Sequence, residues 1–359
     1  PRRAADHTGT AEYPRGMDQT AATAGRAPIA ITLGDACGIG PEIILKAFAA
    51  GLPAPCMVVG DAGLLAREAR RLGLPLEVQA MPAQGSAGLP ATDAATAAAA
   101  TQATAATADA TTAAAGTPIA APPGNGAPAL LSPTLVPVLD AIRLPADLPV
   151  GAVDARAGEA AYRCIAHAAA MAMRGEVRAV VTAPISKEAL HRAGHRYPGH
   201  TELLAELAGG VPVRMMLANH ELRTVLVTIH LALREALDAL GTAGIAETIA
   251  ITDAALRRAG IAAPRIAVAG VNPHAGEGGH LGREEIDVVA PAVAQARAQG
   301  IDARGPFAPD TVFMRARGFA EFDVVIAMYH DQGLIPVKYL GLDEGVNITI
   351  GLPFVRTSP

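Results

Sequence analysis

The sequence lacks tryptophan and is poor in every other aromatic residue. Only 3% of its 359 residues are aromatic, although 51% are hydrophobic, and much of the hydrophobic share is alanine. We therefore expect a core built from Val, Ile, Leu and Ala rather than from aromatic rings. A chain of this length is long enough for two domains of ordinary size.

Frequent cysteine, a strong net charge and long apolar runs are also missing. The three cysteines show no Cys-x-x-Cys spacing, which is typical of a reducing compartment. The net charge is −5 without a basic block, so nothing favours a nucleic-acid partner. No apolar run approaches the roughly 18 residues of a membrane span, and residues 1–26 lack the apolar middle of a signal peptide. We expect a cytoplasmic protein without a membrane partner.

Two stretches are unlike the rest of the chain. Residues 1–26 are small and polar, which predicts a disordered tail. Between Ala91 and Ala115, 15 of 25 residues are Ala and 7 are Thr. Because this composition offers no large apolar side chain to bury, we expect a mobile insertion at about 84–130.

Elsewhere short apolar runs alternate with helical patterns, which predicts an α/β fold with parallel strands. The expected strands are 29–33, 54–60, 177–182, 212–218, 223–229, 265–271 and 323–329, and the expected helices are 61–73, 157–174, 231–259 and 283–299.

Three of the strand-like runs lead into a histidine: 224–229 into His230, 265–271 into His274 and 323–329 into His330. Ligands of an open α/β sheet bind just beyond the carboxyl ends of its strands. Three imidazoles delivered there favour a divalent-metal site with an open position for a substrate. A single histidine at a strand end is more often an ordinary polar loop residue, and three of them lower those odds without reversing them.

The segments around these histidines add detail. His274 lies in a glycine-dense loop, residues 272–280, which lets backbone approach a ligand closely. His280 shares the loop, but its surroundings are those of a helix start, so it is a weaker candidate. Asp331 follows His330 directly and could orient a ligand imidazole or take part in proton transfer.

Other side chains favour an anionic ligand. His200 and Thr201 precede an expected helix that Thr201 could cap, and a helix amino end attracts negative charge. Lys338, Asn347 and Arg356 follow at intervals of nine residues, and Lys and Arg suit phosphate or carboxylate. Each of these could also be an ordinary turn or surface residue. The glycine turn at 34–42 is neither a dinucleotide fingerprint nor a Walker motif.

Together these segments resemble the 4-hydroxythreonine-4-phosphate dehydrogenase family of vitamin B6 biosynthesis. The matching stretches are GDACGIGPE, VTAPISK, YPGHTE, TIHLALRE, GVNPHAGEGGHLGREE, GPFAPDT, AMYHDQGLIPVKY and GVNITIGLPFVRTS. They occur in the family's order and cover nearly all of residues 28–359 outside the insertion. NPHAGEGG and YHDQG are the most specific of them.

The resemblance implies a fold of the isocitrate/isopropylmalate-dehydrogenase type, with two α/β domains and the active site in the cleft between them. It also implies a homodimer whose sites take residues from both subunits. We assign 27–180 plus 331–359 to the first domain and 181–330 to the second, dimerising domain. The family continues past this match into an Asp-His-Gly-Thr-Ala segment and a terminal helix, so we expect the printed sequence to stop short of them.

The resemblance also assigns roles to residues. The divalent metal, Zn2+, Co2+ or Mg2+, is expected on His230, His274 and His330. The expected substrate-binding residues are His200, Thr201, Lys338, Asn347 and Arg356. Lys338 and Asp331 are the candidate catalytic residues, and Gly276, Gly278 and Gly279 are the expected contacts of NAD or NADP.

The activity that the resemblance implies is oxidation of 4-phosphohydroxy-L-threonine by NAD(P)+, followed by loss of CO2 to give 3-amino-2-oxopropyl phosphate. One alternative keeps the fold but acts on a four-carbon sugar-acid phosphate or an aromatic cis-dihydrodiol acid. Another is a three-histidine metallohydrolase without a dinucleotide, against which the glycine-rich loop and the dehydrogenase pattern around it argue.

Overall fold

The computed structural model describes residues 27–81, 134–341 and 344–358. The expected disordered tail at 1–26 and the expected insertion at about 84–130 lie outside the described residues. Among those described, twelve strands form one sheet in the order β3-β4-β2-β1-β5-β12-β11-β6-β7-β10-β8-β9.

The strands are β1 (Ile29–Thr32), β2 (Cys56–Gly60), β3 (Glu77–Met81), β4 (Leu135–Asp140), β5 (Ala179–Thr182), β6 (Arg214–Ala218), β7 (Arg223–Leu226), β8 (Ile266–Ala269), β9 (Ala303–Phe307), β10 (Val324–Ala327), β11 (Val346–Ile350) and β12 (Val355–Ser358). The α-helices are α2 (Gly40–Ala50), α3 (Ala62–Arg71), α4 (Ala155–Met173), α5 (Lys187–Arg192), α6 (His200–Leu207), α7 (Leu233–Asp238), α8 (Thr242–Arg258), α9 (Ala290–Ala298), α10 (Val312–Ala316) and α11 (His330–Leu340). Short helical segments are η1 (Pro273–Gly279), η2 (Glu285–Val289) and η3 (Arg317–Phe319).

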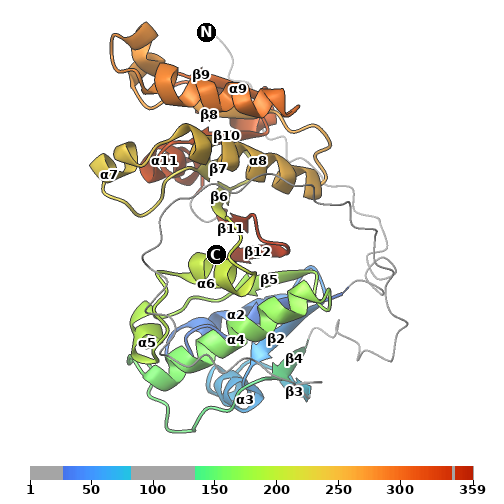
Figure 1. Cartoon of the computed structure of the whole chain (residues 1–359). Coiled ribbons are helices and arrows are strands. Elements are labelled where there is room, and N and C mark those ends of the chain that lie inside the picture. Colours follow the sequence, from blue (N-terminus) through green and yellow to red (C-terminus); the bar gives the residue numbers. More distant parts are fainter. Residues whose placement is uncertain (1–26, 82–133, 342–343, 359) are drawn as a thin grey trace, which may run out of the picture.

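The sheet has two parallel parts joined by antiparallel strands. β1 to β5 lie in the lower part of Figure 1 and β7 to β10 in the upper part, with β6, β11 and β12 between them. The expected α/β class is confirmed, but β6 and β11 run antiparallel to their neighbours. The reason at β6 is its link to β7, since residues 219–222 are too few for the crossover that a parallel pair requires.

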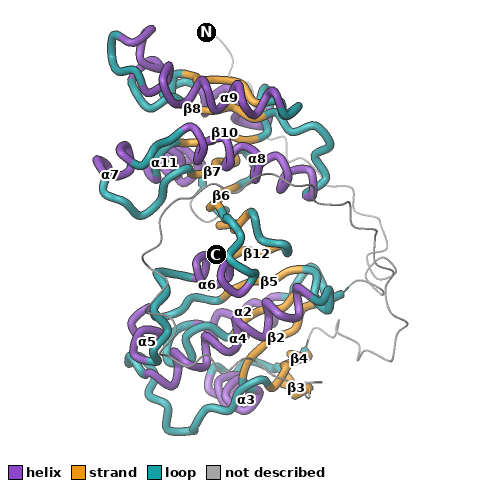
Figure 2. Tube along the Cα trace, in the orientation of Figure 1, coloured by secondary structure: helices purple, strands orange, loops and turns teal. Residues whose placement is uncertain are grey.

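The core is aliphatic and falls into three clusters. The first draws on β1, β2, β4 and β5 with the helices α2, α3, α4 and α6. The other two cover opposite faces of the upper strands, with α8 and α9 on one face (Figure 2) and α10 and α11 on the other. The alternation is visible in β10, where Val324 and Ile326 belong to one cluster and Val325 and Ala327 to the other.

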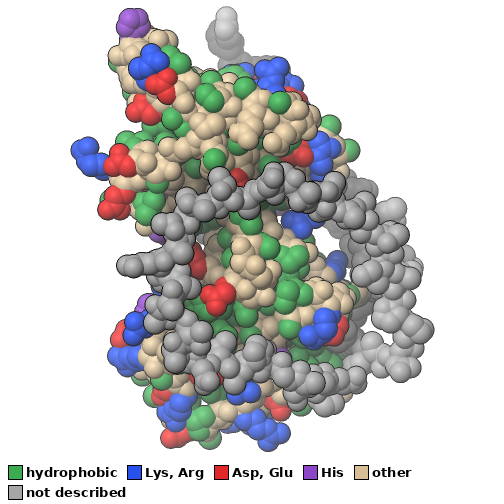
Figure 3. Space-filling model, in the orientation of Figure 1, with side chains coloured by type: hydrophobic (Ala, Val, Ile, Leu, Met, Phe, Trp, Pro, Cys, Tyr) green, Lys and Arg blue, Asp and Glu red, His purple; other side chains and the backbone are tan. Residues whose placement is uncertain are grey.

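α5 and α6 pack against α4, and α11 packs against β7 and β10. The domain boundaries at residues 180 and 330 stay a prediction. On the face seen in Figure 3, basic and acidic side chains are interspersed. No helix within the described ranges has the length and apolarity needed to span a bilayer.

Two expected helices are interrupted. The helix expected at 231–259 is two helices, α7 and α8, because Gly241 takes an extended conformation (φ −143°, ψ 151°) and begins the second one. Glycine is costly inside a helix and weakens the run there. The helix expected at 283–299 begins as one π turn, η2, before α9. Pro291 near the start of α9 has no N–H to donate, which disfavours a continuous α-helical ladder.

Candidate active site

The three candidate metal ligands follow three neighbouring strands. β10 pairs in parallel with β7 on one side and with β8 on the other. His230 comes shortly after β7, His274 lies in η1 after β8, and His330 begins α11 after β10. All three therefore leave the sheet at the same edge, where an α/β protein binds its ligands.

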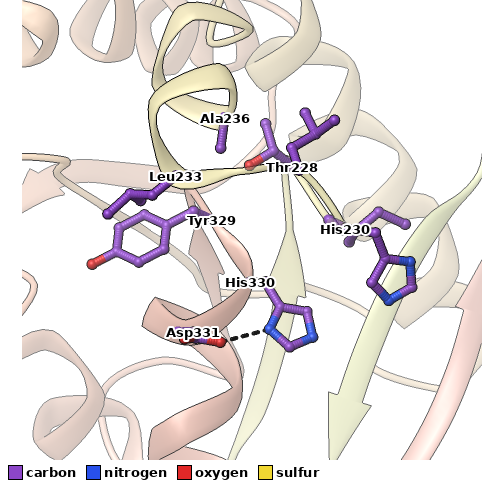
Figure 4. A pocket seen from close by; sticks show the side chains of 9 residues that line it. Thr228, His230, Leu233, Ala236, Tyr329, His330 and Asp331 are labelled. Atoms are coloured by element: carbon purple, nitrogen blue, oxygen red, sulfur yellow. Dashed lines mark hydrogen bonds and ion pairs between the residues drawn. The ribbon is translucent and has the colours of Figure 1, made fainter.

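His230 and His330 lie together at this edge. Their ring centroids are 5.8 Å apart, with 42° between the ring planes. Both line a cavity of about 250 Å³ with Thr228, Leu233 and other residues of the two strand ends, and Figure 4 shows the two imidazoles side by side. The backbone of His230 has a φ of 27°, a strained value for a non-glycine residue that is typical of functional sites.

Asp331 contacts one of the two rings. Its Oδ1 lies 2.7 Å from Nδ1 of His330, drawn as the dashed line in Figure 4. A carboxylate in this position fixes the tautomer with a proton on Nδ1 and leaves the Nε2 lone pair available to a metal. The orienting role foreseen for Asp331 stays a prediction, which this contact makes possible.

His274 does not join the pair in the single chain. Its side chain is 63% exposed, and its Nδ1 lies 2.7 Å from Oε1 of Glu277. That hydrogen bond raises the pKa of His274. Within the described ranges no group of three or more His, Cys, Asp or Glu side chains is placed to hold a metal ion. One chain thus supplies two of the three expected ligands to a common point.

The loop that carries His274 is built around a buried carboxylate. Glu285 is 2% exposed. It accepts hydrogen bonds from the N–H groups of Val271 and Asn272 at 2.6 and 2.7 Å, and from Nδ2 of Asn272 at 3.0 Å. Burial would raise the pKa of Glu285, but these hydrogen bonds outweigh it and lower the pKa. The carboxylate is therefore ionised and ties the loop to η2.

Glycines make room for this carboxylate. A Cβ on Gly270 would lie 2.9 Å from Oε1 of Glu285, and one on Gly276 would lie 2.7 Å from Oε2. Gly276, Gly278 and Gly279, the expected cofactor contacts, all have positive φ, which favours glycine. His274 itself has a φ of 52°, so the loop lies in the left-handed region from His274 to Gly279.

Two side chains form hydrogen bonds between the segments that follow the strands β7, β8 and β10. Gln332 is buried; its Oε1 accepts from the N–H of Met328 at 2.6 Å, and its Nε2 donates to the carbonyl of Gly270 at 2.8 Å. Thr228 donates from Oγ1 to the carbonyl of Met328 at 2.8 Å. These bonds link the segments leading to His230, His274 and His330 at the edge where β7, β8 and β10 end.

The candidate catalytic residues share one face of α11. Asp331 and Lys338 are seven residues apart, two helical turns, so both lie on the same side. Both are exposed, as are Ile335 and Tyr339 on that side. Asn347 lies at the start of β11 and is partly exposed.

Arg356 is the most buried of the expected substrate-binding residues. It is 2% exposed, and its two terminal nitrogens donate to Oγ1 of Thr349 at 2.9 Å and Oγ1 of Thr182 at 2.7 Å. Its Nε has no partner. Burial lowers the pKa of Arg356 to about 10, which leaves the guanidinium charged at neutral pH.

His200 lies close enough to Arg356 to feel its charge. Burial, with a smaller effect of Arg356, lowers the pKa of His200 to about 3. Its ring is hydrogen-bonded to the backbone of Ala183, and its Nε2 is buried without a partner. Thr201 lies in the first turn of α6, and the expectation that it caps the helix is wrong, because Gly199 occupies that position without a side-chain cap.

Comparison with known proteins places the chain in a family. The family model described as pyridoxal phosphate biosynthetic protein PdxA matches residues 53–359. This chain belongs to the PdxA family. It is 46% identical over 336 residues to a 4-hydroxythreonine-4-phosphate dehydrogenase of Beijerinckia indica, covering 92% of this chain and 86% of the relative.

Two other PdxA relatives are similarly close. A D-threonate 4-phosphate dehydrogenase of Salmonella typhimurium is 44% identical over 334 residues, with 92% of this chain and 89% of the relative covered. The crystal structure of a 4-hydroxythreonine-4-phosphate dehydrogenase from Klebsiella pneumoniae matches with a TM-score of 0.75 and 43% identity, over 92% of this chain and 90% of that one. The expected family, the α/β fold and the oxidoreductase class are confirmed.

Sequence reasoning missed several residues of this PdxA site. The motifs GREE, YHDQG and TIHLALRE contain Glu285, Gln332 and Thr228. The sequence therefore offered a signal by which these residues could have been found. A polar residue one or two positions from a candidate ligand could have been examined as its support. Thr182 and Thr349 gave no comparable signal, because threonine is common in strands.

The depressed pKa of His200 predicts a pH-dependent stability. Its pKa is about 3 in the folded protein and 6.5 ordinarily, so between these values only the unfolded chain takes up the proton. Stability should therefore fall as the pH drops below 6.5, by up to about 1.4 kcal/mol per pH unit. Urea unfolding of wild type and His200→Asn from about pH 7 to about pH 5 checks this. Equal pH slopes in the two proteins would refute it.

Proposed function

We propose that this PdxA-family chain oxidises the alcohol of 4-phosphohydroxy-L-threonine with NAD+ or NADP+, using a divalent metal. The oxidised product then loses CO2 to give 3-amino-2-oxopropyl phosphate. The observation that carries the proposal is the pair of imidazoles of His230 and His330 at the carboxyl edge of parallel strands, 5.8 Å apart. The relative of Beijerinckia indica, 46% identical, supports the substrate.

The donor set fits a divalent metal in part. His230 and His330 supply two imidazole nitrogen donors beside a cavity, and the carboxylate of Asp331 contacts one of the two rings. Imidazole suits Zn2+ and Co2+ and is less suited to Mg2+. A metal held by His230 and His330 would supply the positive charge that polarises a substrate hydroxyl and offsets negative charge developing on loss of CO2.

The third ligand is His274 of the partner subunit in a homodimer. Support comes from the exposure of His274 and from apolar side chains left open around the site. Large exposed hydrophobic residues in the segments that carry the histidines are Leu231, Leu233, Leu237, Leu281, Ile286, Ile335 and Tyr339. Exposed apolar surface of this kind favours a protein partner. A two-fold symmetric dimer would repeat the contact, so two sites would be completed at once.

The remaining roles follow the geometry of the loop and of α11. A bound nicotinamide would supply the hydride acceptor, and Gly276, Gly278 and Gly279 would let the backbone approach that cofactor. The side-chain amine of Lys338 has no hydrogen bond or ion pair with any described residue, so it is available to hold the substrate or move its proton. Asp331, seven residues away, is the second candidate for proton transfer.

The anionic end of the substrate belongs to a second group of residues. Arg356 supplies a buried positive charge, and His200 supplies an uncharged ring nitrogen without a partner. Thr201, Asn347 and Lys338 complete the set of proposed substrate-binding residues. A phosphate suits this set, although a carboxylate uses the same donors.

The alternative substrate with support is a four-carbon sugar-acid phosphate. The relative of Salmonella typhimurium named for D-threonate 4-phosphate is nearly as similar, at 44% identity. Such a substrate keeps the phosphate and the alcohol, so the same residues would serve. An aromatic cis-dihydrodiol acid and a hydrolysis reaction remain weaker candidates.

One assay tests these assignments. The purified protein, with Zn2+, Co2+ or Mg2+ added, is offered 4-phosphohydroxy-L-threonine or D-threonate 4-phosphate together with NAD+ or NADP+. We expect reduced nicotinamide and released CO2 in equal amounts with the first substrate. Turnover of D-threonate 4-phosphate alone would show that the sugar-acid phosphate is the substrate. Substrate breakdown without any dinucleotide would overturn the dehydrogenase.

A further inference from the structure

The guanidinium of Arg356 is held by neutral groups only. β12 lies between β5 and β11 near the middle of the sheet, and each neighbouring strand supplies one hydroxyl. Thr182 on β5 accepts from one terminal nitrogen at 2.7 Å, and Thr349 on β11 accepts from the other at 2.9 Å. The two hydroxyls fix the orientation of the planar group without cancelling its charge.

Such an arrangement is unusual for a buried arginine. Buried charges are ordinarily paired with an opposite charge, because an isolated one is costly in a low-dielectric interior. Glu202 favours the charge of Arg356, but no ion pair or hydrogen bond joins the two among the described residues. Apart from this effect of Glu202, the positive charge of Arg356 is uncompensated among the described residues.

Unpartnered polar atoms gather at the same place. Within the described ranges, five buried side-chain nitrogen or oxygen atoms have no hydrogen-bond partner, among them Nε of Arg356, Nε2 of His200 and Oγ1 of Thr32. Thr32 is the register partner of Thr182 on β1, and His200 is bonded to Ala183, the residue after Thr182. Native proteins rarely leave such atoms unpaired, so this concentration indicates a missing ligand.

We propose that Thr182 and Thr349 are positioning residues that hold Arg356 charged and uncompensated, so that an oxyanion of the substrate, phosphate or carboxylate, supplies the missing partner. The proposal rests on the proposed function, because it assigns Arg356 and His200 to the substrate's anionic group. Without the anion, the buried charge destabilises the fold. When the anion binds, it pairs with the charge and stabilises the protein.

The test compares anion binding in matched threonine variants. Thr182→Val keeps the shape but removes the acceptor, and Thr182→Ser keeps the acceptor. Thr224→Val is the control, since Thr224 is a fully buried strand threonine in the upper part of the sheet whose hydroxyl has no partner. Thermal unfolding with inorganic phosphate and, in a second arm, with acetate measures binding as a rise in Tm.

We expect one of the two anions to raise the Tm of the wild type. Thr182→Val should bind that anion about 10-fold more weakly, because the guanidinium loses its orientation, whereas Thr182→Ser and Thr224→Val should bind it as the wild type does. The KM for the phosphorylated substrate should rise in Thr182→Val with little change in kcat, as for a contact made equally in the ground and transition states. Arg356→Met should unfold at a higher temperature than the wild type when no anion is present.

The outcomes separate this proposal from the proposed function. Wild-type affinity for the anion in Thr182→Val, or no rise in Tm with either anion, would overturn the positioning role. If dehydrogenase activity is present but KM is unchanged in Thr182→Val, the function stands and the role of Thr182 fails. If anion binding depends on Thr182 but no nicotinamide is reduced, the positioning role of Thr182 stands and the dehydrogenase function fails. Should Thr182→Val not fold, Thr349→Val takes its place with the same expectations.

Discussion

Replacing His274 with alanine is expected to abolish stoichiometric binding of a divalent metal while the protein stays folded. The imidazole of His274 is exposed, and its loop is held by Glu285 rather than by the ring, so the substitution removes a ligand without removing support. Loss of an outer-shell partner alone weakens metal binding by about 10- to 100-fold, and loss of a direct ligand should exceed that. Metal content after gel filtration, with circular dichroism to check folding, measures the effect.

His280→Ala is the matched control for this prediction. His280 ends the same loop, is also exposed and has no side-chain hydrogen bond to a described residue. Its replacement should leave the metal content unchanged. A full metal complement in His274→Ala, or an equal loss in both variants, would show that the ligand assignment is wrong.

Replacing Glu285 with alanine is expected to destabilise the protein by about 3 kcal/mol, since a buried carboxylate that accepts several hydrogen bonds is lost. The N–H groups of Val271 and Asn272 would lose their acceptor, and Nδ2 of Asn272 would keep only its bond to Glu284. A cavity would also open beside Gly270 and Gly276. Denaturant unfolding gives the stability, and hydrogen exchange at Val271 and Asn272 locates the change.

The neighbouring Glu284 supplies the control. It also accepts from Nδ2 of Asn272, at 2.6 Å, but it is exposed. Because exposed polar contacts contribute little, Glu284→Ala should change stability by less than about 0.5 kcal/mol. If the two variants are equally stable, the buried carboxylate does not hold the loop.

The strands that carry the site were predictable because their apolar runs are continuous and end in turn residues. The runs before His230, His274 and His330 became β7, β8 and β10, which are neighbours and parallel. The antiparallel insertion of β11 and β12 was not predictable, because it depends on pairing with β5 and β6, far away in the sequence. The burial of Arg356 is a consequence of that pairing.

The conformation of the loop that carries His274 was not predictable, for a local reason. The sequence pattern predicts that the three histidines follow strands ending at the same edge of the sheet. It does not predict the direction of a loop, which depends on the dihedral angles of the loop. A run of positive φ from His274 to Gly279 sets the course of the loop that holds this exposed imidazole. Glycines favour these positive φ values, and hydrogen bonds to Glu285 anchor the loop. Neither effect can be predicted from the pattern of apolar residues in the sequence.

A mixed dimer of two inactive variants tests the shared metal site most directly. The His274→Ala and His330→Ala chains are co-expressed with different affinity tags, and dimers that carry both tags are isolated. One site in such a dimer combines His230 and His330 of the first chain with His274 of the second, and the other site lacks two ligands. We expect about one metal ion per mixed dimer and none in either parent, as a symmetric two-site dimer requires. A mixed dimer without metal would contradict a site shared between subunits.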